Sequence, residues 1–110
     1  MSGLSLVNEL NDLQTQLTQA IKLMGKYGRD FAKAEHDYKI ALAEKALELR
    51  ASDMPVTLIN KVVYGKVAKE RFTRDTAEVM YKTAQEHINA TKLRLRLVQA
   101  QIDKEWSNER

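Results

Sequence analysis

The chain has two histidines and no cysteine, so a metal site or a proton-transfer site would have to start from histidine. His36 lies between Glu35 and Asp37, and His87 follows Glu86. Neither histidine matches the His-Glu-x-x-His spacing of a helical zinc site or the paired Glu-x-x-His motifs of a di-metal helix bundle. We therefore expect both side chains to be solvated on helix surfaces, with no metal and no cofactor bound.

Other catalytic groups have no better support. The serines stand at the ends of the expected elements, and none has a histidine at a matching spacing: Ser2, Ser5, Ser52 and Ser107. The stretch from Gly25 to Gly28 is too short for a phosphate-binding loop and follows no strand. We expect no catalytic residue, and we predict that the protein is not an enzyme.

The charged residues are more informative. Lys and Arg number 18 and Asp and Glu number 15, and the basic excess gathers at Lys61, Lys66, Lys69, Arg71 and Arg74. Such a cluster can bind nucleic-acid phosphates if its members share an accessible face. Glu70 and Asp75, however, lower the net positive charge of the cluster. Phe72 is expected to be buried, which leaves few aromatic rings for base stacking. DNA binding is therefore the alternative hypothesis.

The elements that position these residues are helices. Four glycines and one proline are too few for the many tight turns of an all-β fold. Hydrophobic residues make up 44% of the chain and charged residues 30%, which excludes a disordered chain, and no apolar run approaches the ~18 residues of a membrane span. The N-terminus does not resemble a signal peptide. We predict one all-α domain over residues 1–110, in the cytoplasm.

The first half of the chain follows one helical period. Apolar residues recur at alternating steps of four and three, which predicts a helix from about residue 5 to residue 50. This stripe consists of Leu6, Leu10, Leu13, Leu17, Ala20, Met24, Tyr27, Phe31, Ala34, Tyr38 and Ala41. After Tyr38 the register shifts to Leu42, Ala46 and Leu49. Gly25 and Gly28 lie within the stripe, where they can kink the helix or allow a close approach.

The second helix is predicted from about residue 66 to residue 106. Its stripe is Ala77, Tyr81, Ala84, Ile88, Thr91, Leu95, Val98, Ile102 and Trp106. The connection at 51–65 contains Pro55 and is unusually apolar, so we expect it to fold back over the end of the helix pair, with room for a short helical turn at 57–62. Two helices of similar length joined once predict a long antiparallel, coiled-coil-like helical hairpin.

A helical hairpin leaves further apolar side chains exposed, because each helix has only one neighbour. Phe31, Tyr38 and Tyr81 are large aromatic residues of this kind, and we predict that they face a second copy. The simplest homo-oligomer is a dimer that forms a four-helix bundle, and a higher oligomer stays open. The alternative is that Ala20, Ala34, Ala77 and Ala84 leave room for some of these rings within one hairpin.

Three stretches of the sequence resemble a known family. They are LRASDMPVTLI at 49–59, ERFTRDTAEVMYKTAQEHIN at 70–89 and LRLVQAQIDKEW at 95–106. Over about residues 20–106 the chain is similar to a family of short helical proteins of phages and prophages of Gram-positive bacteria. In that family a similar loop leads to a glycine, here Gly65, and to a helix whose pattern is matched by Arg71, Phe72, Arg74, Asp75, Ala77, Tyr81, Lys82, Ala84, Glu86 and Ile88. Where the family often has an acidic stretch after the glycine, this chain has the basic segment 66–69.

The resemblance implies a protein of the bacterial host cytoplasm whose gene lies near recombination, annealing and single-strand-binding genes. It implies a non-enzymatic binding or adaptor protein that acts on a host or phage protein, such as an inhibitor of a host enzyme or of a defence system, anti-CRISPR proteins included. The alternative is a DNA-binding accessory protein of phage replication or recombination. The resemblance does not identify the partner.

The predicted partner-binding residues come from the connection and the start of the second helix. They are Met54, Pro55, Val56, Leu58, Ile59, Tyr64, Lys66, Lys69, Arg71 and Arg74. We single them out because loops on a rigid scaffold often carry function and because this connection is unusually apolar. The alternative is that the connection only plugs the end of the helix pair.

Overall fold

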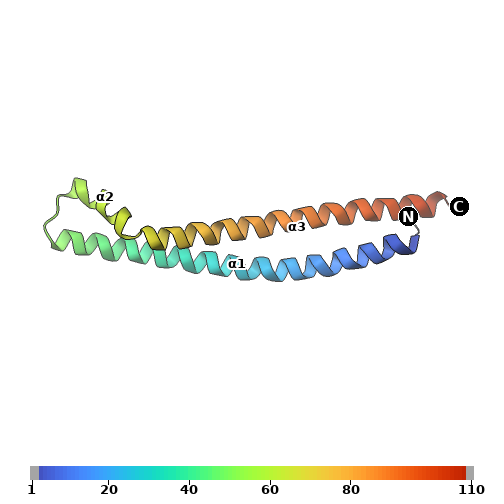
Figure 1. The fold of residues 1–110 in the computed structure, drawn as a ribbon, viewed down its shortest axis with the longest axis horizontal. Coiled ribbons are helices and arrows are strands. Elements are labelled where there is room, and N and C mark those ends of the chain that lie inside the picture. The colour runs from blue at the N-terminus through green and yellow to red at the C-terminus, as the bar shows by residue number, and fades with distance from the viewer. Residues whose placement is uncertain (1–2, 109–110) are drawn as a thin grey trace. The chain divides into compact units, whose positions relative to one another are not determined.

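The computed structural model describes residues 3–108, and this part of the chain is all-helical. Helix α1 spans Gly3–Ala51, α2 spans Val56–Lys66 and α3 spans Ala68–Asn108 (Figure 1). The predicted all-α class is confirmed. In place of the single helical turn expected in the connection at 51–65, the chain forms an 11-residue helix, α2, that runs through Lys66, so the next helix begins at Ala68 and not at residue 66.

The end of α1 is a Schellman motif, in which the chain turns through a left-handed residue. Asp53 has a φ of 59°. The Asp53 N–H donates to the Arg50 carbonyl at 3.1 Å, and the Met54 N–H donates to the Leu49 carbonyl at 3.3 Å. Met54 packs against the cluster that contains Leu49, which is the apolar contact typical of this motif. Pro55 then stands as the N-cap of α2, so local backbone chemistry separates the two helices.

A single residue, Val67, separates α2 from α3. Its side chain is fully buried. The Val67 N–H donates to the Val63 carbonyl at 3.1 Å, and the Arg71 N–H donates to the Val67 carbonyl at 2.9 Å. Hydrogen bonding therefore continues across the junction while the backbone leaves helical geometry at Val67, where φ is −106° and ψ is 19°.

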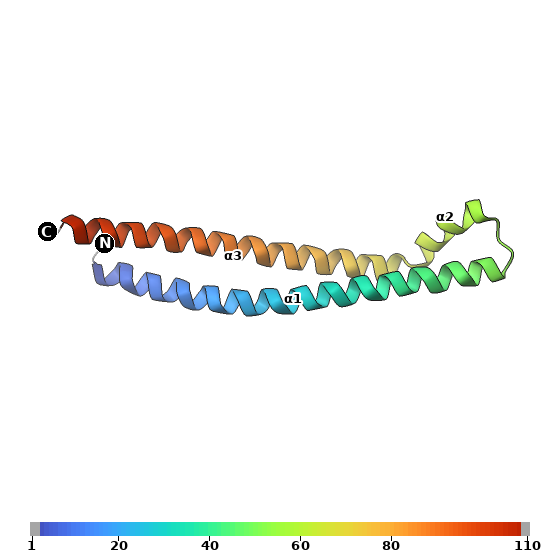
Figure 2. The same cartoon turned by 180° about the vertical axis from the view of Figure 1, so that it is seen from behind.

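The structure consists of two compact units, which we name the terminal unit and the loop unit. The terminal unit is Met1–Lys26 with Lys82–Arg110, and the loop unit is Tyr27–Tyr81. In the terminal unit the first half of α1 lies antiparallel to the second half of α3 (Figures 1 and 2). Its core cluster is Leu6, Leu13, Val98 and Ile102, flanked by Leu10 and Leu95.

The loop unit contains the second half of α1, all of α2 and the first turns of α3. Leu49 of α1 and Ile59 and Val63 of α2 form its core cluster. Leu42, Ala46, Met54 and Val62 pack around this cluster. The register shift predicted after Tyr38 is confirmed, since Leu42 and Ala46 pack against the core and Leu49 is 7% exposed.

The predicted apolar stripes are buried or half-buried with one exception, Trp106, which is 63% exposed. The residues flanking the second stripe behave differently. Phe72 is 72% exposed, so the expectation that it is buried is wrong. Phe72 lies outside the narrow apolar stripe of α3. In a pair of helices, each helix covers only such a stripe of the other.

Candidate functional site

Helix α2 has two different faces. Ile59 and Val63 are four residues apart, lie on one side of the helix and are buried in the loop unit. The outer side exposes Leu58 and Tyr64, each at 48%, whereas Val56, which is 73% exposed, is the first residue of the helix and lies on the side of Val63. The two predictions for the connection therefore apply to different faces of α2. The inner face packs in the core, and the outer face is exposed and available to a partner.

Lysines accompany these exposed apolar side chains, and acids are absent between Asp53 and Glu70. Lys61, Lys66 and Lys69 are all exposed. Leu58, Lys61 and Tyr64 follow at steps of three residues, so they lie next to one another on the outer face. We name these three residues, together with Val56 and Lys66 at the two ends of the helix, the α2 surface.

Gly65 belongs to the same side of α2, seven residues after Leu58. Its φ is not positive, and a Cβ added there would meet nothing within 4 Å. Neither backbone conformation nor packing in this chain requires a glycine, although glycine costs helix stability by about 1 kcal/mol relative to alanine.

Several predicted partner-binding residues belong to the core or to internal contacts instead. Ile59 is 5% exposed and packs in the core. Met54 is half-buried against the same cluster. Pro55, Val56, Leu58, Tyr64 and Lys66 are exposed on or beside α2. The apolar period of the sequence does not distinguish the buried from the exposed residues of this segment. The two faces of α2 distinguish them, and the sequence predicts only a short helical turn there.

The predicted basic cluster does not form one face. Lys69 and Arg71 are both exposed but lie about 200° apart around α3. Lys69 lines a depression of about 210 Å³ together with Asp37 and Glu70. Its charge therefore stands near two carboxyl groups, which weakens its attraction for phosphate.

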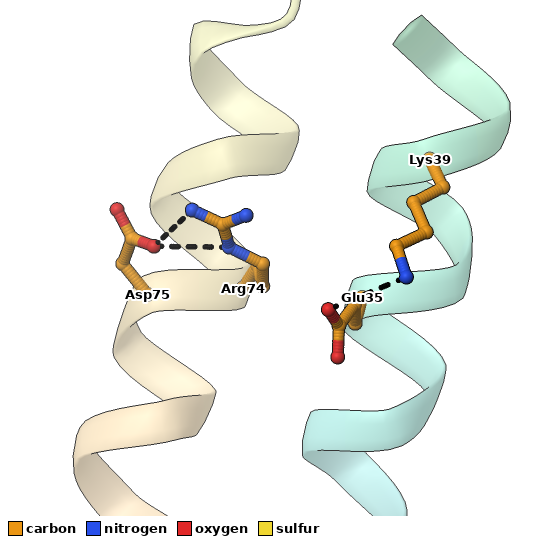
Figure 3. A network of polar contacts seen from close by, with 4 residues as sticks. All are labelled: Glu35, Lys39, Arg74 and Asp75. Carbon is orange, nitrogen blue, oxygen red and sulfur yellow. Dashed lines mark hydrogen bonds and ion pairs between the residues drawn. The ribbon is translucent and has the colours of Figure 1, made fainter. Parts of the chain in front are cut away.

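Arg74 is engaged within the loop unit. Its guanidinium carbon lies 4.4 Å from the centre of the Tyr38 ring. Its Nη2 and Nε donate to Asp75 Oδ1 at 2.8 and 3.0 Å, as Figure 3 shows beside the Glu35–Lys39 ion pair. The hydrogen bonds to Asp75 are the main cause that raises the pKa of Arg74. Arg74 is thus a positioned, partly exposed cation whose charge is already paired with Asp75.

The three rings predicted to face a second copy pack within the loop unit. Tyr38 is 6% exposed. Phe31 and Tyr81 are half-buried, and their ring centroids lie 6.1 Å apart at 35°. A Cβ on Gly28 would lie 3.1 Å from Tyr81 Cε2, so this glycine leaves room for the ring. Tyr38 is therefore accommodated within the loop unit, whereas Phe31 and Tyr81 keep part of their surface exposed.

A cavity that the apolar stripes do not predict lies between α1 and α3 of the loop unit. Its volume is about 280 Å³. Its lining residues are Tyr27, Asp30, Phe72, Thr73, Thr76, Ala77 and Met80. Phe72, Thr76 and Met80 recur at steps of four residues on α3, and this spacing is the sequence signal that marks a second apolar stripe.

His36 and His87 are exposed, as predicted. Within residues 3–108 no group of three or more His, Asp or Glu side chains is placed to hold a metal ion. In the same range, no helix is both long and apolar enough to span a membrane.

Comparison of the chain with models of protein families, with curated proteins and with solved structures gave no match. The resemblance to phage proteins therefore stays a prediction.

Proposed function

We propose that the protein is a non-enzymatic binding protein whose α2 surface docks on an apolar and acidic surface of a protein partner. One observation carries the proposal: α2 buries one face in the loop unit and exposes Leu58 and Tyr64 on the other. Following the resemblance, the partner is a host or phage protein in the bacterial cytoplasm, and the protein acts as an adaptor or an inhibitor.

The composition of the α2 surface supports a partner of this chemistry. Exposed apolar side chains gathered on one helix face, with a polar rim, are typical of protein-interaction sites. Tyrosine is enriched at such sites, because it offers a large rigid contact area and a hydroxyl group. The lysines, with no acid between Asp53 and Glu70, favour a partner with carboxylates around its apolar centre.

The proposal assigns no reaction to this surface. Valine, leucine and tyrosine side chains offer contact area, and the neighbouring lysines offer positive charge. Neither set provides the convergent acid, base and nucleophile of an enzyme site.

The test begins with affinity capture from host lysate, followed by binding measurements with each purified captured protein. The double variant Leu58→Ser, Tyr64→Ser should lower affinity at least about tenfold while the fold is retained. Leu93→Ser is the matched control, since Leu93 is 55% exposed in the terminal unit and Leu58 is 48% exposed in the loop unit. Unchanged affinity in the double variant, or equal loss in the control, would contradict the proposal.

DNA binding is the second candidate, because the acid-free stretch at 54–69 carries three lysines. Its support is reduced by the engaged Arg74 and by the divergent positions of Lys69 and Arg71. A fluorescence anisotropy titration with single- and double-stranded DNA at low salt separates the candidates. Binding that falls steeply with salt, and that falls again with Lys61→Glu and Lys66→Glu, would replace the protein-docking proposal.

Self-association is also part of the proposal, including the dimer that forms a four-helix bundle. The support for it no longer comes from Phe31, Tyr38 and Tyr81, which pack within the loop unit. It comes from apolar side chains that the loop unit leaves exposed on α3.

A further inference from the structure

Between Phe72 and Met80, one side of α3 is formed by apolar and threonine side chains. Phe72 is 72% exposed, Val79 is 61% exposed and Met80 is 42% exposed. At 100° per residue, all three lie within about 60° of Thr76 around the helix axis. We name Phe72, Thr73, Thr76, Val79 and Met80 the α3 surface.

The charged residues of the same turns lie on other sides of the helix. Arg74 and Glu78 are each about 160° from Thr76, and Asp75 is about 100° from it. Arg74 is held over the Tyr38 ring and bonded to Asp75. The α3 surface therefore carries no charge of its own from Phe72 to Met80.

This surface has few polar side-chain atoms, and one of them already has a hydrogen-bond partner. Thr73 Oγ1 donates to the Lys69 carbonyl at 3.1 Å, so this hydroxyl already has a partner in its own helix. Burial of Thr73 against an apolar neighbour consequently leaves no donor unpaired. Thr76 is a small residue at the centre of the surface, where it permits two helices to approach closely.

Four residues of the same surface line the cavity of about 280 Å³, together with Tyr27, Asp30 and Ala77: Phe72, Thr73, Thr76 and Met80. One copy of the chain thus carries an exposed aromatic side chain and, next to it, a hollow that can receive one. A surface with both features can be complementary to itself through a two-fold axis.

We propose that the α3 surface binds the α3 surface of a second copy, with the two helices antiparallel and the two-fold axis at Thr76. Phe72 and Met80 are each four residues from Thr76, so an antiparallel pair brings Phe72 of each copy opposite Met80 of the other. Methionine sulfur and aromatic rings make favourable contacts. Thr73 and Val79 are each three residues from Thr76, so Thr73 of each copy lies opposite Val79 of the other.

A second copy is the occupant because the pattern on α3 is symmetric about one residue and its own side chains from Phe72 to Met80 carry no charge; the nearby carboxyl group, Asp30, belongs to α1 and lines the cavity. The α3 side chains of this face meet their copies without like-charge repulsion, whereas the α2 surface would bring its lysines together. The exposed area of Phe72, Val79 and Met80 is on the order of 300 Å² per chain, which places the contact among small, weak interfaces. The dimer is therefore concentration-dependent, and it is independent of docking at the α2 surface.

The absence of cysteine from the chain allows a direct test by single-cysteine cross-linking. Thr76→Cys should form a disulfide-linked dimer under mild oxidation of the folded protein, because the two-fold axis places the two thiols face to face. Thr57→Cys is the matched control, an exposed threonine on α2 in the same unit. Circular dichroism before oxidation verifies that both variants are folded.

A second measurement uses sedimentation velocity from about 10 µM to about 1 mM, the range in which a weak dimer forms. The wild-type mass should rise above 12.6 kDa with concentration. Phe72→Ala with Met80→Ala should raise the dissociation constant at least about tenfold, and Leu58→Ser with Tyr64→Ser should leave it unchanged. Equal cross-linking of the two cysteine variants, a constant monomer mass, or sensitivity to the α2 changes alone would each overturn the proposal.

Discussion

The guanidinium carbon of Arg74 lies 4.4 Å from the centre of the Tyr38 ring. The sequence pattern predicts these two residues on different outer surfaces, Arg74 for a partner and Tyr38 for a second copy. In the structure they meet between α1 and α3 of the loop unit, with Tyr38 buried and Arg74 bonded to Asp75. This contact turns two predicted interface residues into a stabilising pair.

Tyr38 should therefore contribute to stability through its ring. Tyr38→Ala is expected to lower the free energy of unfolding by about 3–5 kcal/mol, since it removes a buried aromatic side chain and leaves a cavity. Tyr38→Phe keeps the ring and its contact with Arg74, so its effect should be small. Urea denaturation of the three proteins checks this. A Tyr38→Ala variant of normal stability but altered oligomeric state would support the earlier assignment instead.

The turn at Asp53 offers a stabilising change. A left-handed residue at the end of a helix is usually glycine, because a Cβ is strained there. With a φ of 59° at this position, Asp53→Gly is expected to raise the free energy of unfolding by about 0.5–1 kcal/mol. Asp53→Ala should lower it, since alanine keeps the Cβ and loses the local hydrogen bonding of aspartate. Thermal melts of both variants test the sign, and a rise in both would refute the role assigned to the turn.

Gly65 and Gly28 should respond differently to alanine. The space around Gly65 is open, whereas a Cβ on Gly28 would lie 3.1 Å from Tyr81 Cε2. Gly65→Ala is expected to stabilise the protein by about 0.5–1 kcal/mol through helix propensity. Gly28→Ala should gain less or destabilise, because the Tyr81 ring must shift. Chemical denaturation compares the two, and a larger gain at Gly28 would contradict the close contact.

The two faces of α2 should separate in stability measurements. Ile59→Ala removes a side chain that is 5% exposed and should cost about 2–4 kcal/mol. Leu58→Ala removes a neighbour that is 48% exposed and should change stability by no more than about 0.5 kcal/mol. Comparable costs for both substitutions would show that the outer face is also core.

Much of the helical architecture was predictable from local patterns. The apolar period through Leu6, Leu13, Ala20 and Ala34 identified side chains that the structure buries, because a helix presents residues three and four apart on one side. The register shift toward Leu49 was predictable for the same reason. The length of α2 was not, because Pro55 suggested an irregular connection although proline is well tolerated immediately before a helix.

The candidate surfaces depended on contacts between residues distant along the chain. Periodicity shows that Ile59 and Leu58, or Tyr38 and Phe72, are apolar and where each lies around its helix. Burial follows from the neighbour that covers each face: α1 covers Ile59, and Arg74 lies over Tyr38, whereas Leu58 and Phe72 remain exposed. The helical class and the apolar stripes thus followed from local spacing, since each helix makes its own backbone hydrogen bonds. The division of apolar residues between core and open surface came from packing, because a helix pair covers only one narrow side of each helix.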